Sequence, residues 1–93
     1  MMLHSDAYRQ MTRLIMEAAD DLCDGRLVLA HEGGYSATYV PFCGLAIVEK
    51  LSGIRTEIAD PYLEMTKSWG YQELQPHQSA AIDRASALLD HIQ

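Results

Sequence analysis

The stretch from Arg26 to Tyr35, RLVLAHEGGY, decides the predicted fold. Residues 27–30 form an unbroken apolar run, which is typical of a strand that is covered on both faces in a parallel sheet. Polarity then changes abruptly, and the pair Gly33 and Gly34 permits backbone angles that other residues resist. Because ligands in open α/β sheets bind beyond the carboxyl ends of the strands, Tyr35 lies where a functional side chain is expected.

Composition limits the classes of function. The chain has 93 residues, so one small domain is expected, with a modest core. The formal net charge is −6 and the seven Lys and Arg residues are scattered, so neither nucleic acid nor an anionic membrane is an expected partner. No apolar run approaches 18 residues, and residues 1–10 show no secretory signal. A cytoplasmic location is therefore expected.

The two cysteines, Cys23 and Cys43, form no CxxC motif. Both fall on apolar faces of predicted helices. We expect them to be reduced and buried, as in a cytosolic protein, in preference to a disulfide.

Helices are predicted on both sides of the strand from their caps and their apolar periodicity. The first begins at Ser5 as its N-cap and ends at Asp24-Gly25. Its predicted core stripe consists of Tyr8, Met11, Ile15, Ala18 and Leu22. The next helix is expected at about 37–51, with Pro41 tolerated only in its first turn and Ser52-Gly53 at its end. The later elements are a weak edge strand at 54–59, a helix from Asp60-Pro61 to Gly70, a linker at 71–75 and a last helix from Pro76 with Ile82, Ala85, Leu89 and Ile92 as its stripe.

A single buried strand presents a physical problem. Its backbone donors and acceptors would be unpaired, at ~1–3 kcal/mol for each unsatisfied group. The helix at 37–51 is apolar nearly all round, as in a helix that is buried inside something larger. We therefore expect the chain to be part of a larger α/β domain. The alternative is that a second copy supplies the missing strands by oligomerisation or swapping.

Two catalytic motifs nearly match near Tyr35. Residues 31–35, HEGGY, lack the second histidine of the zinc-protease pattern HExxH, and the glycines break the helix which that pattern requires. Residues 34–38, GYSAT, lack the second glycine of the nucleophile elbow GxSxG, and no His–acid pair is placed to activate Ser36. We reject both. His4, His77 and His91 lie near predicted helix ends, where exposed or capping roles are expected.

Residues 23–53, CDGRLVLAHEGGYSATYVPFCGLAIVEKLSG, resemble the C-terminal region of bacterial class II histone deacetylase-like amidohydrolases. That family includes the acetylpolyamine amidohydrolases. Its pattern here is a GRLV strand, then EGGY, then a helix with a YVPFCG-like stretch. Residues 1–20 resemble the helix that precedes this strand. The resemblance weakens beyond residue 53.

The resemblance implies a three-layer α/β/α fold of the arginase/deacetylase type. Residues 1–93 would be a C-terminal fragment of that domain, mostly helical with one strand of the parallel type. It also implies zinc-dependent hydrolysis of an N-acetyl amide, such as acetyl-lysine or an acetylpolyamine. The loop tyrosine, here Tyr35, would donate its hydroxyl to the developing oxyanion, and a phenol is protonated and able to donate at neutral pH. Gly33 and Gly34 would shape the substrate-binding loop.

The chain departs from the family pattern in its metal ligands. The family uses an Asp-x-His pair, a later Asp and a His-His pair, and this sequence has neither DxH nor HH. No metal ligand is therefore predicted here, and the isolated chain is expected to bind no zinc and to be inactive. Its partners would be an acetylated lysine or small molecule in a longer protein, with self-association of the fragment as a further expectation. The alternative function is a non-catalytic binding or scaffolding domain with the same fold remnant.

Overall fold

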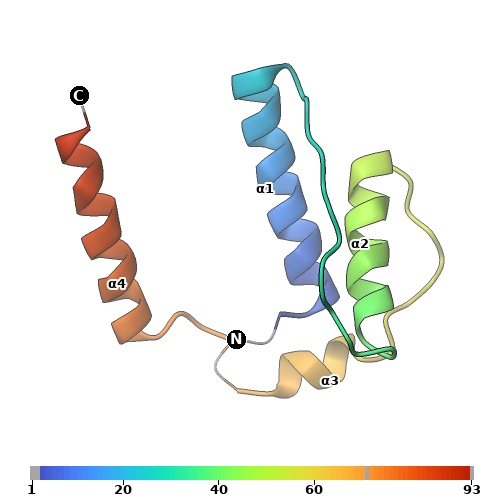
Figure 1. The fold of residues 1–93 in the computed structure, drawn as a ribbon. Helices are drawn as coiled ribbons and strands as arrows, with labels where there is room; N and C mark the ends of the chain where they lie inside the picture. The colour runs from blue at the N-terminus through green and yellow to red at the C-terminus, as the bar shows by residue number, and fades with distance from the viewer. Residues whose placement is uncertain (1–2, 71, 93) are drawn as a thin grey trace.

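The structure, a computed structural model, describes residues 3–70 and 72–92. In chain order the elements are α1 (Ser5–Cys23), α2 (Val40–Ser52), α3 (Leu63–Ser68), α4 (Pro76–Ser86) and the 3-10 helix η1 (Ala87–His91). Helices α1 and α2 pack side by side, and α3 crosses near one end of the pair (Figure 1). Helix α4 continues into η1 and stands apart from α1 and α2 (Figure 1).

The predicted α/β fold is wrong for this chain. Within the part of the chain that the structure describes, no residue belongs to a strand, so the three-layer α/β/α arrangement is absent there. Residues 26–35 run extended from the end of α1 toward the start of α2 (Figure 1), with Val28 92% exposed. An apolar run forms a strand only when neighbouring strands accept its backbone hydrogen bonds, and the described residues offer none. The weaker strand predicted at 54–59 is wrong for the same reason.

Helix α1 begins where the sequence predicts, but with a different cap. The Nδ1 atom of His4 accepts a hydrogen bond from the Ala7 N–H at 3.1 Å, so His4 occupies the N-cap and Ser5 is the first helical residue. At the other end Asp24 and Gly25 both have positive φ, 55° and 72°, which ends the helix at the predicted position.

The face of α1 that packs against α2 differs from the predicted one. Its buried residues are Ser5, Thr12 and Ala19, which recur every seven positions. Small side chains at this spacing let two helices approach closely. The predicted stripe is instead largely exposed: Met11 37%, Ile15 46% and Leu22 85%. The sequence therefore identified an amphipathic helix and assigned its core-facing side to the wrong flank.

Helix α2 begins at Val40, three residues later than expected, and has Pro41 in its first turn as predicted. The Val40 N–H donates to the Ser36 carbonyl oxygen at 3.0 Å. Gly53, at φ 71°, ends the helix as predicted. Cys43 is buried and free, as expected, whereas Cys23, the last residue of α1, is free but exposed.

Helix α4 begins at the predicted Pro76, whereas α3 begins at Leu63 with Tyr62 as its N-cap, two residues after the predicted start at Pro61. Asp60 Oδ1 accepts the Tyr62 N–H at 2.8 Å just before α3, and Pro76 opens α4. The predicted linker 71–75 begins at Tyr71, which lies outside the described residues. The predicted apolar stripe of the last helix is exposed: Ile82 is 52% exposed, Leu89 65% and Ile92 73%.

The buried apolar centre of the described chain is small, and consists of Ala19, Cys43 and Ala46. Along residues 3–70 and 72–92, no helix has both the length and the hydropathy that crossing a membrane requires.

Candidate functional site

The loop before α2 has a backbone that requires glycine. Gly33 and Gly34 have φ values of +72° and +79°, which side chains other than glycine rarely adopt. A Cβ at Gly34 would lie 3.1 Å from Cγ1 of Val40 and 3.2 Å from Nε2 of His31, whereas a Cβ at Gly33 would meet nothing within 4 Å. Gly34 therefore lets the loop close tightly against the first residue of α2.

Tyr35 follows this glycine pair and is 97% exposed. Its phenol is an O–H donor on the surface of the molecule, directly before the turn that leads into α2. In the same turn Ser36 Oγ lies 3.5 Å from Thr38 Oγ1, close enough for the two hydroxyls to share a hydrogen bond. The exposed hydroxyl of Tyr35 can therefore donate a hydrogen bond to a ligand.

The sequence-predicted residues Gly33, Gly34 and Tyr35 lie together in this one loop. None of the three lines either of the two cavities beside Arg9 and Glu49. A small cavity of about 30 Å³ lies elsewhere, between α1, α2 and the segment before α3. Ser5, Arg9, Glu49 and Asp60 are among the polar residues that line it.

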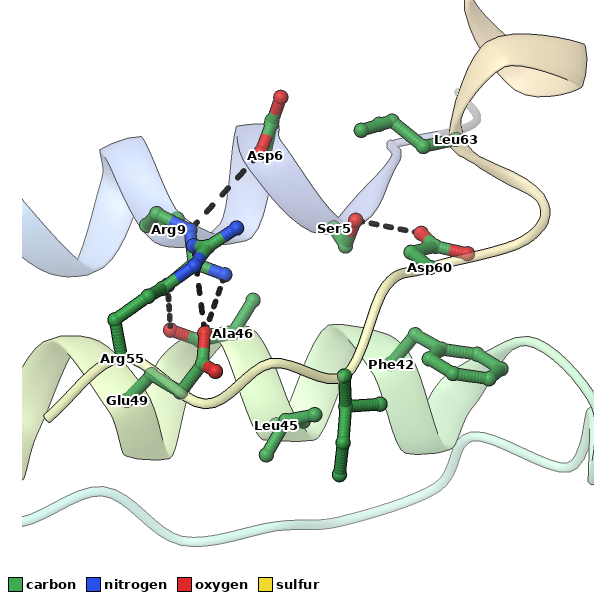
Figure 2. Close-up of a pocket in the computed structure, with 11 residues that line it drawn as sticks. Ser5, Asp6, Arg9, Phe42, Leu45, Ala46, Glu49, Arg55, Asp60 and Leu63 are labelled. Atoms are coloured by element: carbon green, nitrogen blue, oxygen red, sulfur yellow. Dashed lines mark hydrogen bonds and ion pairs between the residues drawn. The ribbon is translucent and has the colours of Figure 1, made fainter.

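An ion-pair cluster borders that cavity and was not predicted from the sequence (Figure 2). Arg9 Nη2 lies 2.7 Å from Glu49 Oε2, and Arg55 Nη1 lies 3.4 Å from the same oxygen. The Thr56 N–H donates to Glu49 Oε1 at 2.8 Å, and the Thr56 hydroxyl donates to it too. Arg9 also donates to the Ala46 carbonyl oxygen at 3.4 Å. No pattern of nearby residues could show this cluster, since Arg9 and Glu49 are 40 positions apart.

The hydrogen bonds and ion pairs of Glu49 determine whether its carboxylate could act as a general base. The hydrogen bonds from the side chain and backbone of Thr56, with Arg9 and Arg55 close by, lower the pKa of Glu49 to about 2. Its side chain is 4% exposed. A carboxylate with so low a pKa accepts protons poorly near neutral pH, so this cluster fixes α2 to α1 and does not act as a general base.

Cys43 is unsuited to nucleophilic catalysis. Burial raises the pKa of the Cys43 thiol above its ordinary value, which keeps it in the weakly reactive protonated form. Burial, the neighbouring Cys43 and more distant groups raise the pKa of Tyr39 to about 12. Both residues therefore act as packing groups at the start of α2.

No group of three or more His, Cys, Asp or Glu residues that could hold a metal ion occurs among residues 3–70 and 72–92. His4, the predicted capping or exposed histidine nearest to α1, caps that helix, and His77 and His91 are exposed near the ends of α4 and η1. The described residues of this chain therefore do not fit a zinc ion.

Comparison with known proteins shows which proteins the chain resembles. No family model matches it. The chain is nevertheless a relative of the histone deacetylases, and the resemblance predicted from residues 23–53 is confirmed. A particular relative is the histone deacetylase-like amidohydrolase of Pseudomonas aeruginosa, which is 57% identical over 61 residues, 66% of this chain. Histone deacetylase 8 of Arabidopsis thaliana is 28% identical over 81 residues, 87% of this chain.

The match with the bacterial relative includes the candidate site. A match of 61 residues in a chain of 93 contains residues 33–61 wherever it begins, and so contains Gly33, Gly34 and Tyr35. The chain spans only 16% of the length of that relative and 20% of the length of the plant relative. What the whole relatives do can therefore be transferred to this chain only as a proposal.

Proposed function

We propose that the chain contributes Tyr35 as the hydrogen-bond donor to the substrate carbonyl in a deacetylase that hydrolyses an N-acetyl amide. The observation that carries this proposal is the position of Tyr35. It is 97% exposed, it follows two glycines with positive φ, and it lies within the region matched by the histone deacetylase-like amidohydrolase.

The chemistry of a phenol suits this role. When water attacks an amide carbonyl, negative charge develops on the carbonyl oxygen. A neutral O–H donor that points at this oxygen binds the transition state more strongly than the substrate, and so raises the rate. The hydroxyl of Tyr35 would donate that hydrogen bond, and the Gly33-Gly34 backbone, which carries no Cβ, would let the acetyl group approach closely.

The remaining parts of such a site would lie outside this chain. The family resemblance implies zinc, and the described residues here do not fit zinc, so no step of the reaction is assigned to the metal in this chain. The candidate substrates are those with an N-acetyl amide: acetylated lysine, acetylated polyamines and small acetylated molecules. The chain by itself is proposed to be inactive, and a cytoplasmic location is proposed from its composition.

A chimera tests the role of Tyr35. In it, the segment of the P. aeruginosa relative that matches this chain is replaced by the corresponding residues of this chain. Tyr35→Phe removes one hydroxyl and keeps the ring, so kcat should fall by about 10²–10³, as when other oxyanion donors are removed. KM should change less than kcat, because the bond strengthens as charge develops.

The matched control is Tyr39→Phe in the same chimera, which removes a buried hydroxyl outside the proposed site. It should leave kcat within a few fold of the parent chimera. Zinc content and melting temperature should be the same in the parent and the Tyr35→Phe chimera, since an exposed ring packs little in either form. Turnover of the Tyr35→Phe chimera at the parental rate would refute the catalytic role.

A further inference from the structure

A second cavity, of about 200 Å³, lies at the C-terminal end of α2. It is here called the basic cavity, and its lining residues are Arg9, Glu49, Lys50, Gly53, Ile54 and Arg55. The chain has only seven Lys and Arg residues and a formal charge of −6, yet three of the seven border this cavity. The basic cavity is therefore a local exception to the negative charge of the chain, and its electrostatic potential favours an anion.

The one carboxylate in the lining does not cancel these charges. Three cations and one carboxylate leave a formal excess of two positive charges. The Glu49 side chain is 4% exposed, and the Thr56 N–H already donates to its Oε1. Its Oε2 lies 2.7 Å from Arg9 Nη2 and 3.4 Å from Arg55 Nη1, so it holds both guanidinium groups in position (Figure 2). Donors that are positioned before a ligand arrives lose less entropy when it binds.

The three basic side chains retain donors for a ligand. A guanidinium group has five N–H donors, and the Arg55 side chain is 64% exposed with one contact to Glu49. Among residues 3–70 and 72–92, half-buried Lys50 forms no ion pair. The Nε atom of Arg9 is buried and has no hydrogen-bond acceptor within the same residues. A buried donor without an acceptor is rare in folded proteins, and is an independent sign that a ligand is missing here.

We propose that the basic cavity binds a phosphate group, either as the free ion or in a small phosphate monoester. Guanidinium groups bind phosphate oxygens through paired N–H donors, and an ammonium group adds a compact positive charge. A phosphate monoester carries about −1.5 to −2 at neutral pH, which matches the excess of two positive charges. A phosphate that belongs to a nucleic acid or a membrane is disfavoured, since the chain as a whole repels such anionic surfaces.

The end of α2 opposes an anion only in part. The last carbonyl groups of a helix carry a partial charge of roughly −0.5, and Lys50 in the last turn offsets this charge. Arg9 and Arg55 are not needed for that purpose, so their charge is available to a ligand. The loop with Tyr35 precedes the opposite end of α2, about 20 Å away for 13 residues at ~1.5 Å each. Phosphate binding therefore does not depend on the proposed function.

A titration with phosphate tests the site. The chain is titrated with sodium phosphate at constant ionic strength, and binding is measured by calorimetry and by the rise in melting temperature that a ligand of the folded state causes. We expect a Kd on the order of 1 mM, which weakens as sodium chloride is raised. Sodium acetate at the same ionic strength should bind at least several-fold more weakly. Phenyl phosphate, beside inorganic phosphate, shows whether the free ion or a monoester binds more tightly.

Three substitutions that each remove one positive charge locate the binding. Lys50→Gln breaks no ion pair of the described chain, and should weaken phosphate binding by about 3- to 10-fold; Arg55→Gln should do the same. The matched control is Arg84→Gln, at an exposed position in α4 outside the basic cavity, which should bind phosphate as the wild type does. Tyr35→Phe should also bind as the wild type does.

The results that would overturn the site are specific. Equal phosphate affinity in the Lys50→Gln, Arg55→Gln and Arg84→Gln variants would show a response to net charge and no site. Equal effects of phosphate and acetate would show a response to ionic conditions alone. If the isolated chain has no cooperative melt, the same titration is made with the chimera described above. Absence of phosphate binding by that chimera would refute the proposed site.

Discussion

Arg9 of α1 and Glu49 of α2 form an ion pair, with Nη2 2.7 Å from Oε2, that joins the two helices. Glu49 is the acceptor at which several groups meet, because Arg55 and Thr56 from the segment after α2 contact the same carboxylate. One buried side chain thus links α1, α2 and the chain that leads to α3 (Figure 2).

The contacts of Glu49 make the free energy of unfolding fall as the pH is lowered. The pKa of Glu49 is about 2 in the folded chain, against an ordinary value of ~4.3. Since the folded-state pKa is depressed, Glu49 stabilises the fold fully above pH ~4.3, and this contribution is lost as the pH falls toward 2. Glu49→Gln should therefore be less stable than the wild type at pH 7 and lose less on acidification. Thermal melts of dilute protein by far-UV circular dichroism, from pH 7 to 2, measure both.

The control for this prediction is Glu17→Gln. Glu17 pairs with Arg13 four residues earlier on α1, with Nη1 2.7 Å from Oε1, but the Glu17 side chain is 57% exposed. Exposed pairs of this kind contribute only ~0.3–0.5 kcal/mol. Equal losses of stability from Glu49→Gln and Glu17→Gln at pH 7 would show that the buried pair contributes no more than an exposed pair.

Asp60 connects the start of α1 to the start of α3. Its Oδ2 accepts the Ser5 hydroxyl at 2.5 Å, and its Oδ1 accepts the Tyr62 N–H at 2.8 Å. Asp60→Ala removes both bonds, so we expect a loss of about 1–2 kcal/mol in the free energy of unfolding by urea, within the range of cap deletions. Ser5→Ala removes one bond and should cost less. Asp83→Ala, in exposed α4, serves as the control and should be nearly neutral.

The isolated chain is expected to bind no zinc and to have no deacetylase activity, and metal analysis tests this. The sequence contains neither HH nor DxH, and the described residues hold no cluster of three ligands. We therefore expect less than one tightly bound zinc per ten chains after dialysis, and no hydrolysis of an acetyl-lysine peptide above the rate without protein (order-of-magnitude expectation from the ligand number that zinc requires). One tightly held zinc per chain, together with turnover, would contradict this expectation.

The exposed apolar surface predicts the behaviour of the isolated chain in solution. Ordering ~90 residues nearly cancels the gain from burial even in complete small domains, and the buried apolar centre here is made of three small residues. The chain should be marginally stable and self-associate with rising concentration. Sedimentation at several concentrations and a thermal melt provide the measurement. A monodisperse monomer with a sharp cooperative melt would mean that the chain is a self-sufficient domain.

Local signals in the sequence located most helix ends. Pro41 and Pro76 fall in the first turns of α2 and α4, and Gly53 follows the end of α2, as predicted. Such signals act through the backbone of one or two residues, so the sequence alone contains them. The N-cap of α1 was missed, because histidine is an unusual N-cap.

Features that depend on distant parts of the chain were not predictable. The run at 27–30 has the composition of a strand, but a strand needs hydrogen-bond partners that the described chain does not provide. The apolar stripe of α1 predicted a helix correctly, but it did not predict which face of that helix contacts α2. That face depends on the packing of other parts of the chain. The pair of Arg9 and Glu49 depends on the packing of two helices. In the candidate site, the loop with Gly33, Gly34 and Tyr35 was found from the sequence because its members are adjacent; its catalytic role stays a prediction.

Gly33 and Gly34 of that loop should differ in how well they tolerate a side chain. Both have positive φ, so an alanine at either position is strained by ~1–2 kcal/mol. Only at Gly34 would the new Cβ also press on Val40, 3.1 Å away. Gly34→Ala should therefore open the loop more than Gly33→Ala. The Val40 N–H reports this opening, because it donates to the Ser36 carbonyl oxygen at 3.0 Å and exchanges with solvent when the loop opens.

Amide hydrogen exchange measures the difference, and a second substitution identifies its cause. Gly33→Ala should speed exchange at residue 40 by roughly 5–30-fold, the factor that corresponds to 1–2 kcal/mol, and Gly34→Ala should speed it further. Val40→Ala removes both Cγ atoms, and the remaining close atom, Nε2 of His31, lies at the end of a side chain that can turn away. Gly34→Ala added to that background should therefore cost about as much as Gly33→Ala does. Such a double-mutant cycle isolates the contact between the two positions. If Gly34→Ala costs as much with alanine at position 40 as with valine, backbone strain alone explains the glycine, and the close approach to Val40 has no part in holding the loop that carries Tyr35.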